Sequence, residues 1–184
     1  MATTALSVTD LEQVESVFAA ASDDAALFSA IVNSPFTLLT VPTAMLFLGI
    51  VVFLQVNKET GLIDRIALSN TELAQNTTDV SVVPFSEIKI PVDHNENIIS
   101  QAIQTNTPQD TTDWKFLFEP AMSAEQARLN QASGGIAYSA VYPLSARNGG
   151  AMIFSYFQYQ SEIGAPQHDF MRAYTDLVNK YLST

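Results

Sequence analysis

The residue types that could do chemistry in this sequence gather first around its only tryptophan. Trp114 stands between Asp113 and Lys115, and Phe118 follows in the same segment. An indole beside a carboxylate and an ammonium could close a pocket over a planar or zwitterionic ligand. The same segment could instead fasten itself to the core, which is the commoner use of clustered aromatic side chains. Both interpretations stay open at this level.

A second group of candidate binding residues lies on two strand-like runs, Ile136–Leu144 and Ala151–Gln160. Alternation along a strand places every second side chain on the same face. The aromatic candidates on these faces are Tyr138, Tyr142, Phe154 and Tyr156. Tyrosine hydroxyls could orient a ligand there, although ordinary cross-strand packing would use the same residues.

Catalysis and metal binding have no comparable set of residues. The absence of cysteine removes thiolate chemistry and cysteine-ligated zinc. His94, within Asp93–Glu96, could bind a metal or shuttle protons, but helix capping is favoured because no second ligand pair stands at a suitable spacing. No serine occupies a Gly-x-Ser-x-Gly elbow, and no glycine-rich loop resembles a phosphate cradle. We therefore expect no catalytic residues, no metal, no cofactor and no enzymatic activity.

The charge balance limits the partners of the chain. Nineteen Asp and Glu residues against eight Lys and Arg residues give a net charge of −11 over 184 residues. This charge repels phosphate backbones and anionic membranes, so no nucleic-acid partner is expected. With 47% apolar and 15% charged residues, the composition is typical of a compact fold. No secretory signal opens the sequence, and we expect a cytoplasmic location.

One stretch could argue for a membrane span. No charged residue occurs between Ala25 and Asn57, and Phe36–Val56 is largely apolar. Its length suits a transmembrane helix, but Pro35 and Pro42 interrupt it and no basic residues flank its start. We expect instead a helix end, a polar turn and then a buried strand, with a membrane anchor as the less favoured alternative.

The remaining pattern predicts strands and helices in mixed order. Strands are expected at Ala44–Val56, Leu62–Ser69, Ile88–Val92, Ile136–Leu144 and Ala151–Gln160. Helices should open near Thr9, Asp24, Glu96, Ser123 and Pro166, where capping residues precede apolar residues at helical spacing. The polar segment Asn70–Val83 predicts a loop or a frayed helical turn. Asn148-Gly149 predicts a tight hairpin turn with positive φ at both residues.

Several segments follow one another in an order that resembles a GAF domain. They are Ile88–Pro91, Asn97–Pro108, Thr112–Trp114, Ala140–Leu144, Gly149–Phe154 and Phe170–Leu182. The resemblance extends from about Asp24 to Leu182. It implies an α+β fold, also PAS-like, with a central antiparallel sheet of five to six strands. Terminal helices would cover one face of the sheet, and short helices and loops the other.

The resemblance also implies a sensory or regulatory module. Such a module would bind a small molecule beneath the covering loops, signal through its terminal helices and act on a separate output protein. The implied ligand-binding residues are Asp113, Trp114, Lys115, Phe118, Tyr138, Tyr142, Phe154 and Tyr156. Residues 1–22 would form a helix that helps a homodimer to assemble, ahead of a domain at residues 23–184. The implied dimer contacts are Leu11, Val14, Phe18, Tyr174, Leu177 and Tyr181.

Departures from the family narrow these expectations. The chromophore-bearing branch and the free methionine sulfoxide reductase branch both need cysteine, so neither activity is expected. The cyclic-nucleotide branch has an Asn-Lys…Phe…Asp-Glu signature, of which only Asn57-Lys58 is present. The alternative to a sensor is a degenerate scaffold of the same fold, with a filled pocket, that serves only protein association.

Overall fold

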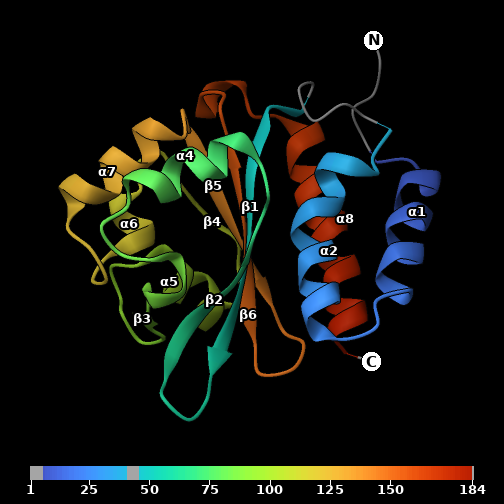
Figure 1. Cartoon of the computed structure of the whole chain (residues 1–184), viewed down its shortest axis with the longest axis horizontal. Coiled ribbons are helices and arrows are strands. Elements are labelled where there is room, and N and C mark those ends of the chain that lie inside the picture. Colours follow the sequence, from blue (N-terminus) through green and yellow to red (C-terminus); the bar gives the residue numbers. More distant parts are fainter. Residues whose placement is uncertain (1–5, 41–45, 184) are drawn as a thin grey trace.

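The computed structural model describes residues 6–40 and 46–183. Within these ranges a six-stranded antiparallel sheet carries helices on both faces, which confirms the expected α+β class (Figure 1). In chain order the helices are α1 (Val8–Ala19), α2 (Asp24–Thr37), α4 (Glu72–Val80), α5 (Ile98–Thr105), α6 (Lys115–Phe118), α7 (Ala124–Ser133) and α8 (Ala165–Leu182). The strands are β1 (Leu48–Asn57), β2 (Leu62–Leu68), β3 (Ile90–Pro91), β4 (Gln109–Thr111), β5 (Tyr138–Leu144) and β6 (Gly150–Tyr156).

Strands β1 and β6 form the centre of the sheet, whose strand order is β3-β2-β1-β6-β5-β4. In this register Val52 of β1 lies opposite Leu68 of β2 and Ile153 of β6. The first seven residues of β1 are buried, because helices cover both faces of the sheet here. The predicted start of this strand at Ala44 lies outside the described residues, and β1 itself begins at Leu48.

Helix α2 continues through Pro35, where the sequence predicts a helix end. A proline inside a helix leaves the carbonyl four residues earlier without its usual donor. That carbonyl belongs to Ile31, and it accepts a hydrogen bond from the Tyr174 hydroxyl of α8 at 2.8 Å. The apolar stretch Phe36–Val56 thus begins in the last turn of α2 and ends in β1. Across residues 6–40 and 46–183, no helix has the length and apolar character needed to span a membrane.

Alternate residues of β1 enter two separate apolar cores. Val51 and Phe53 belong to the core shared with α1, α2 and α8, and the rings of Phe53 and Phe28 lie 5.0 Å apart. Ile50 and Val52 belong to the core beneath α4, α5, α6 and α7. Helix α1 contacts α2 and α8 and covers them from outside (Figure 1). The terminal helices therefore share one face of the sheet, as the sequence predicts.

The polar segment after β2 forms a regular helix, α4, where the sequence left a loop or a frayed turn open. Thr71 caps it by accepting a hydrogen bond from the Ala74 backbone N–H at 3.3 Å. Ala74 and Thr77 are its buried residues, and the helix packs against α7. A capping residue and a non-local contact thus stabilise a helix with few apolar residues.

The N-cap of helix α1 is Ser7, two residues before the predicted cap Thr9. Ser7 Oγ accepts from the Asp10 backbone N–H at 3.1 Å, and Asp10 Oδ2 accepts from the Ser7 backbone N–H at 3.0 Å. Asp10 Oδ1 also accepts from the N–H and the hydroxyl of Thr40, each at 2.6 Å. Burial alone would raise the pKa of Asp10, but the hydrogen bonds from Thr40 and Ser7 outweigh it and lower the pKa to about 2. Asp10 thereby ties α1 to the chain that follows α2.

The hairpin between β5 and β6 is present, but its turn differs from the predicted one. Positive φ occurs at Arg147 (52°) and Gly149 (86°), not at Asn148. Residues 145–149 separate the two strands, so the connection is longer than a two-residue turn. Arg147 then reaches across to Asp24 at the start of α2, with Nη2 lying 2.8 Å from Oδ1.

Candidate functional site

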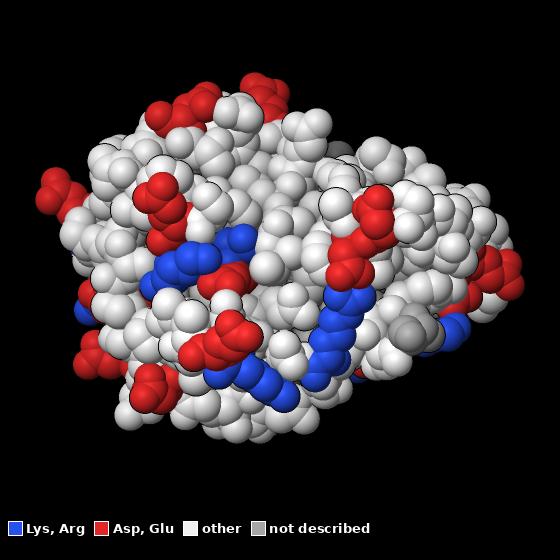
Figure 2. All heavy atoms as spheres, turned by 60° about the horizontal axis from the view of Figure 1, so that its bottom comes forward, with Lys and Arg blue, Asp and Glu red and all other residues white. Residues whose placement is uncertain are grey.

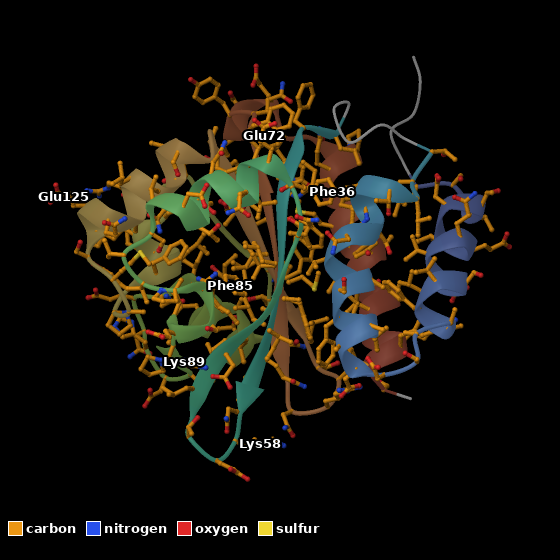
Figure 3. The ribbon with its side chains drawn as sticks, viewed as in Figure 1. Phe36, Lys58, Glu72, Phe85, Lys89 and Glu125 are labelled. Atoms are coloured by element: carbon orange, nitrogen blue, oxygen red, sulfur yellow. The ribbon has the colours of Figure 1, made fainter. Side chains whose placement is uncertain are left out.

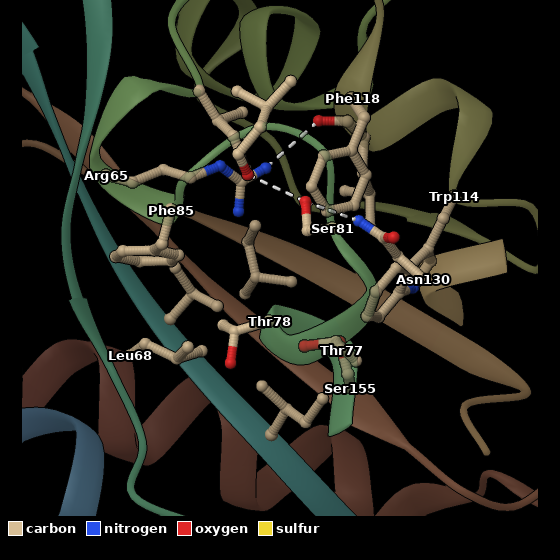
Figure 4. Close-up of a pocket in the computed structure, with 16 residues that line it drawn as sticks. Arg65, Leu68, Thr77, Thr78, Ser81, Phe85, Trp114, Phe118, Asn130 and Ser155 are labelled. Carbon is tan, nitrogen blue, oxygen red and sulfur yellow. Dashed lines mark hydrogen bonds between the residues drawn. The ribbon is translucent and has the colours of Figure 1, made fainter. Parts of the chain in front are cut away.

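A small cavity lies between the sheet and the helices α4, α6 and α7 (Figure 4). Its volume is about 40 Å³, which is space for about two or three water molecules. Ile50, Val52 and Ile153 line it from the two central strands, and Leu117 and Phe118 from α6. The cavity lining is mostly apolar, with a few polar side chains directed into it, and this composition is typical of small-molecule sites.

Trp114 forms part of the cavity wall and is 5% exposed. Its ring packs against that of Phe118 with centroids 5.3 Å apart. Its Nε1–H donates to Ser139 Oγ at 2.9 Å, and Ser139 Oγ lies 2.8 Å from Ser155 Oγ. Because Ser155 also lines the cavity, this buried chain connects the tryptophan with β5, β6 and the cavity. Two of the residues predicted to bind a ligand, Trp114 and Phe118, therefore meet here.

The charged neighbours of Trp114 hold the loop in place and do not line the cavity. Asp113 accepts from Arg128 Nη2 at 2.6 Å and from the Lys115 backbone N–H at 3.0 Å, at the start of α6. The hydrogen bond from Arg128 lowers the pKa of Asp113 below its ordinary value. Lys115 Nζ lies 3.8 Å from Glu119 Oε1. Neither charge reaches the space beneath the indole.

The aromatic residues of the hairpin lie on the other face of the sheet. Tyr138, Tyr142, Phe154 and Tyr156 all belong to the core that the terminal helices cover. There the Phe154 ring contacts Phe170 at 5.8 Å between centroids. Alternation correctly predicts that these side chains share a face. The face that lines the cavity carries the residues between them on the strands, such as Ile153 and Ser155. The structure thus separates these four residues from Trp114 and Phe118.

Arg65 of β2 is a cavity residue that the sequence analysis missed. Its side chain reaches toward Phe118 (Figure 4), with the guanidinium carbon 4.5 Å from that ring centroid and 5.9 Å from that of Phe85. The residue is 7% exposed. Nη2 donates to the Leu117 carbonyl over a long 3.4 Å, and Nε has no partner among the described residues. Burial lowers the pKa of Arg65 to about 9.

A sequence signal for Arg65 did exist. It shares strand parity with Ile63, which is completely buried. The register between β1 and β2 then shifts beside Ile66, so that Leu68, and not Ala67, lines the cavity together with Arg65. A charged residue at an inward position of a strand is rare enough to mark a site.

The other basic side chains are accounted for at the surface. Six of the eight Lys and Arg residues form an ion pair with a carboxylate among the described residues. On the face seen in Figure 2, the basic side chains lie against acidic ones. Of the remaining two, Lys58 lies at the tip of the β1–β2 hairpin (Figure 3), and Arg65 is buried. Arg65 is therefore the one interior cation of the described structure.

The predicted dimer residues mostly pack within the chain. Val14, Phe18, Tyr174 and Leu177 are buried in the core of the terminal helices. Phe18 meets Tyr181 edge to face, with centroids 5.5 Å apart. A homodimer formed through these helices would therefore use side chains other than these four. Dimer formation and the division of the chain at residue 22 stay predictions.

Comparison with known proteins supports the fold. No family model matches the sequence, and no curated protein matches it significantly. Among solved structures, the GAF domain of an Acinetobacter phosphoenolpyruvate-protein phosphotransferase matches with a TM-score of 0.61 at 9% identity, covering 95% of this chain and 90% of that chain. Residues 122 to 287 of a methyl-accepting chemotaxis protein match with a TM-score of 0.59 at 12% identity, covering 94% and 95%. The chain thus has a GAF-like fold.

A third similar structure corrects one expectation. A free methionine-R-sulfoxide reductase from Neisseria meningitidis, in complex with its substrate, matches with a TM-score of 0.58 at 13% identity, covering 94% of this chain and 87% of that chain. The expectation that this chain has no enzymatic activity is therefore corrected, because a similar structure of the same fold is an enzyme. Function has to be argued from the site itself.

Proposed function

We propose that this chain is a sensory or regulatory domain that binds a small molecule in the cavity beneath Trp114. The observation that carries the proposal is a mostly apolar cavity into which a few polar side chains converge. Arg65 approaches from β2, Ser155 from β6 and Asn130 from α7, where its Nδ2 donates to Ser81 Oγ at 3.1 Å (Figure 4). Apolar walls with a small number of placed polar groups are what a specific ligand site requires.

The cavity also has a physical route to the terminal helices. Its floor residues Ile50 and Val52 alternate on β1 with Val51 and Phe53, which pack in the core of α2 and α8. A ligand that displaces β1 must repack both cores, because protein interiors are close-packed. Displacement of these helices is the signal that a separate output protein would detect.

A ligand screen on the purified chain tests the proposal. Trp114 is the only tryptophan, so its fluorescence reports directly on the cavity, and thermal shift gives a second readout. Ligands should raise the melting temperature, since binding to the folded state alone stabilises it. The cavity can be closed by Val52→Phe, whose added volume is on the order of the space available. Val56→Phe, on the same strand and in the same core but outside the cavity, is the matched control.

Binding should disappear in Val52→Phe and persist in Val56→Phe. Equal binding by both variants would place the ligand elsewhere and refute the proposed site. The alternative is a scaffold that serves only protein association, and the small volume of the cavity supports it. A screen without any hit, together with a crystal structure in which only water fills the cavity, would favour that alternative.

A further inference from the structure

The guanidinium of Arg65 lies in the interior without a counterion. The described residues include all 19 Asp and Glu side chains, and none of them pairs with Arg65. The neighbouring Asp64 pairs instead with Lys89, at 2.8 Å. The chain has a net charge of −11, so carboxylates are plentiful. The one buried cation nevertheless has none as a partner.

The surroundings of this cation leave hydrogen-bond capacity unused. Phe118 and Phe85 lie within 6 Å of the guanidinium carbon, so aromatic rings approach it. Nε–H has no partner among the described residues, and Nη2 makes one long bond to Leu117. Neighbouring N–H groups of a guanidinium form a fork that matches the two oxygens of a carboxylate. A buried charge of this kind is costly unless it is paired.

We propose that the cavity takes a small organic monocarboxylate, whose carboxylate pairs with Arg65 and whose apolar body contacts Val52, Leu68 and Ile153. This inference rests on the proposed function and names the chemical class of its ligand. One buried cation neutralises one negative charge. A phosphate dianion or a dicarboxylate would bring a second charge, and no further Lys or Arg lines the cavity.

The size of the cavity narrows the class further. About 40 Å³ corresponds to about two or three water molecules. The shortest acids, with about two to four carbons, come nearest to this size, although the larger of them need the walls to move outward slightly. The apolar lining favours unsubstituted chains over hydroxylated ones. Branched or aromatic acids would require the walls to move.

The test is calorimetric titration of the full chain with sodium acetate, propionate and butyrate at matched ionic strength in a zwitterionic buffer. The corresponding amides serve as uncharged ligands of the same shape, and inorganic phosphate and succinate serve as dianions. The variants are Arg65→Met and Arg65→Lys. Arg172→Met is the control because Arg172 is exposed and its one ion pair among the described residues is with Asp169.

At least one of these carboxylates should bind the wild type and Arg172→Met equally. Its amide should bind at least tenfold more weakly, and Arg65→Met should lose at least tenfold in affinity, since a charge-assisted bidentate pair is lost. Arg65→Lys, which keeps the charge but not the fork, should retain part of the affinity.

Several results would overturn this inference. They are amides that bind as well as the acids, dianions that bind more tightly than the acids, unchanged affinity in Arg65→Met, or no binding of any acid. Different results decide the proposed function, which does not depend on the ligand being a carboxylate. It survives if neutral compounds bind and Val52→Phe abolishes their binding, and it falls if Val52→Phe leaves all binding intact.

Discussion

Replacement of Arg65 by methionine should make the ligand-free chain more stable. Burial lowers the pKa of Arg65 from its ordinary 12.5 to about 9, which corresponds to about 5 kcal/mol against the charged form as an upper bound. Against this, methionine loses the contact with Phe118, where the guanidinium carbon lies 4.5 Å from the ring centroid and which is worth about 1–2 kcal/mol. The bond to Leu117 is too long to contribute much. The difference, about 3–4 kcal/mol, is an upper bound, so the expected net gain is about 1–3 kcal/mol, in line with other buried ions replaced by apolar residues.

The sign of this effect also fixes its pH dependence. A base with a lowered pKa destabilises the fold wherever it stays protonated, that is, at all pH values below about 9. The gain from Arg65→Met should therefore be constant between about pH 6 and pH 8. It should decline only above about pH 9, where folded wild type can lose the proton.

Urea denaturation followed by tryptophan fluorescence and circular dichroism, in a buffer free of carboxylates and phosphate, measures the gain. A melting temperature several degrees above wild type should accompany it, at about 2–4 °C per kcal/mol for a chain of this length. Arg172→Met should change stability by less than about 0.5 kcal/mol. The reasoning is refuted if Arg65→Met folds cooperatively but is less stable than wild type by about 1 kcal/mol or more. Arg65 would then be a stabilising core residue and not a charge that awaits a ligand.

Three further changes test the fold around the site. Asp10→Ala should lower stability by about 2 kcal/mol at neutral pH by removing the hydrogen bonds to Thr40. Because the pKa of Asp10 is lowered to about 2, the difference in stability from wild type in urea melts should shrink as the pH falls from about 4 toward 2. A difference independent of pH would contradict this. Tyr156→Phe should leave stability unchanged or raise it by about 1 kcal/mol, because the Tyr156 hydroxyl is buried without a partner among the described residues. A clear loss of stability in thermal melts would show that this hydroxyl does form a hydrogen bond. Gly150→Ala should destabilise by about 1–3 kcal/mol, because a Cβ there would collide with the Leu54 carbonyl, and a wild-type melting curve would exclude that collision.

The sequence predicts the layers of this fold because apolar periodicity reports directly on burial. The continuous apolar run gave the central strand β1, and the spacing after Pro166 gave the last helix. Helix α4 escaped prediction, since its support comes from contact with α7, far along the chain. Local propensity contains no information about such a partner.

The site was only half predictable for a related reason. Alternation tells which side chains share a strand face, but β5 and β6 are buried on both faces. Nothing local therefore tells whether Tyr138 or Ser139 points toward the cavity. Trp114 was found because its residue type is rare in this chain. Arg65 was not, although its parity with buried Ile63 was visible, because its isolation from every carboxylate appears only in three dimensions.

The ion pairs at the surface also affect how two copies of this chain meet. Most carboxylates remain outside the six ion pairs, and the pI is near 4.3. Two copies of the chain therefore meet as two polyanions. Such particles repel one another over a screening length of about 10 Å at 0.1 M salt. Added electrolyte shortens that range, so any self-association should strengthen as ionic strength increases.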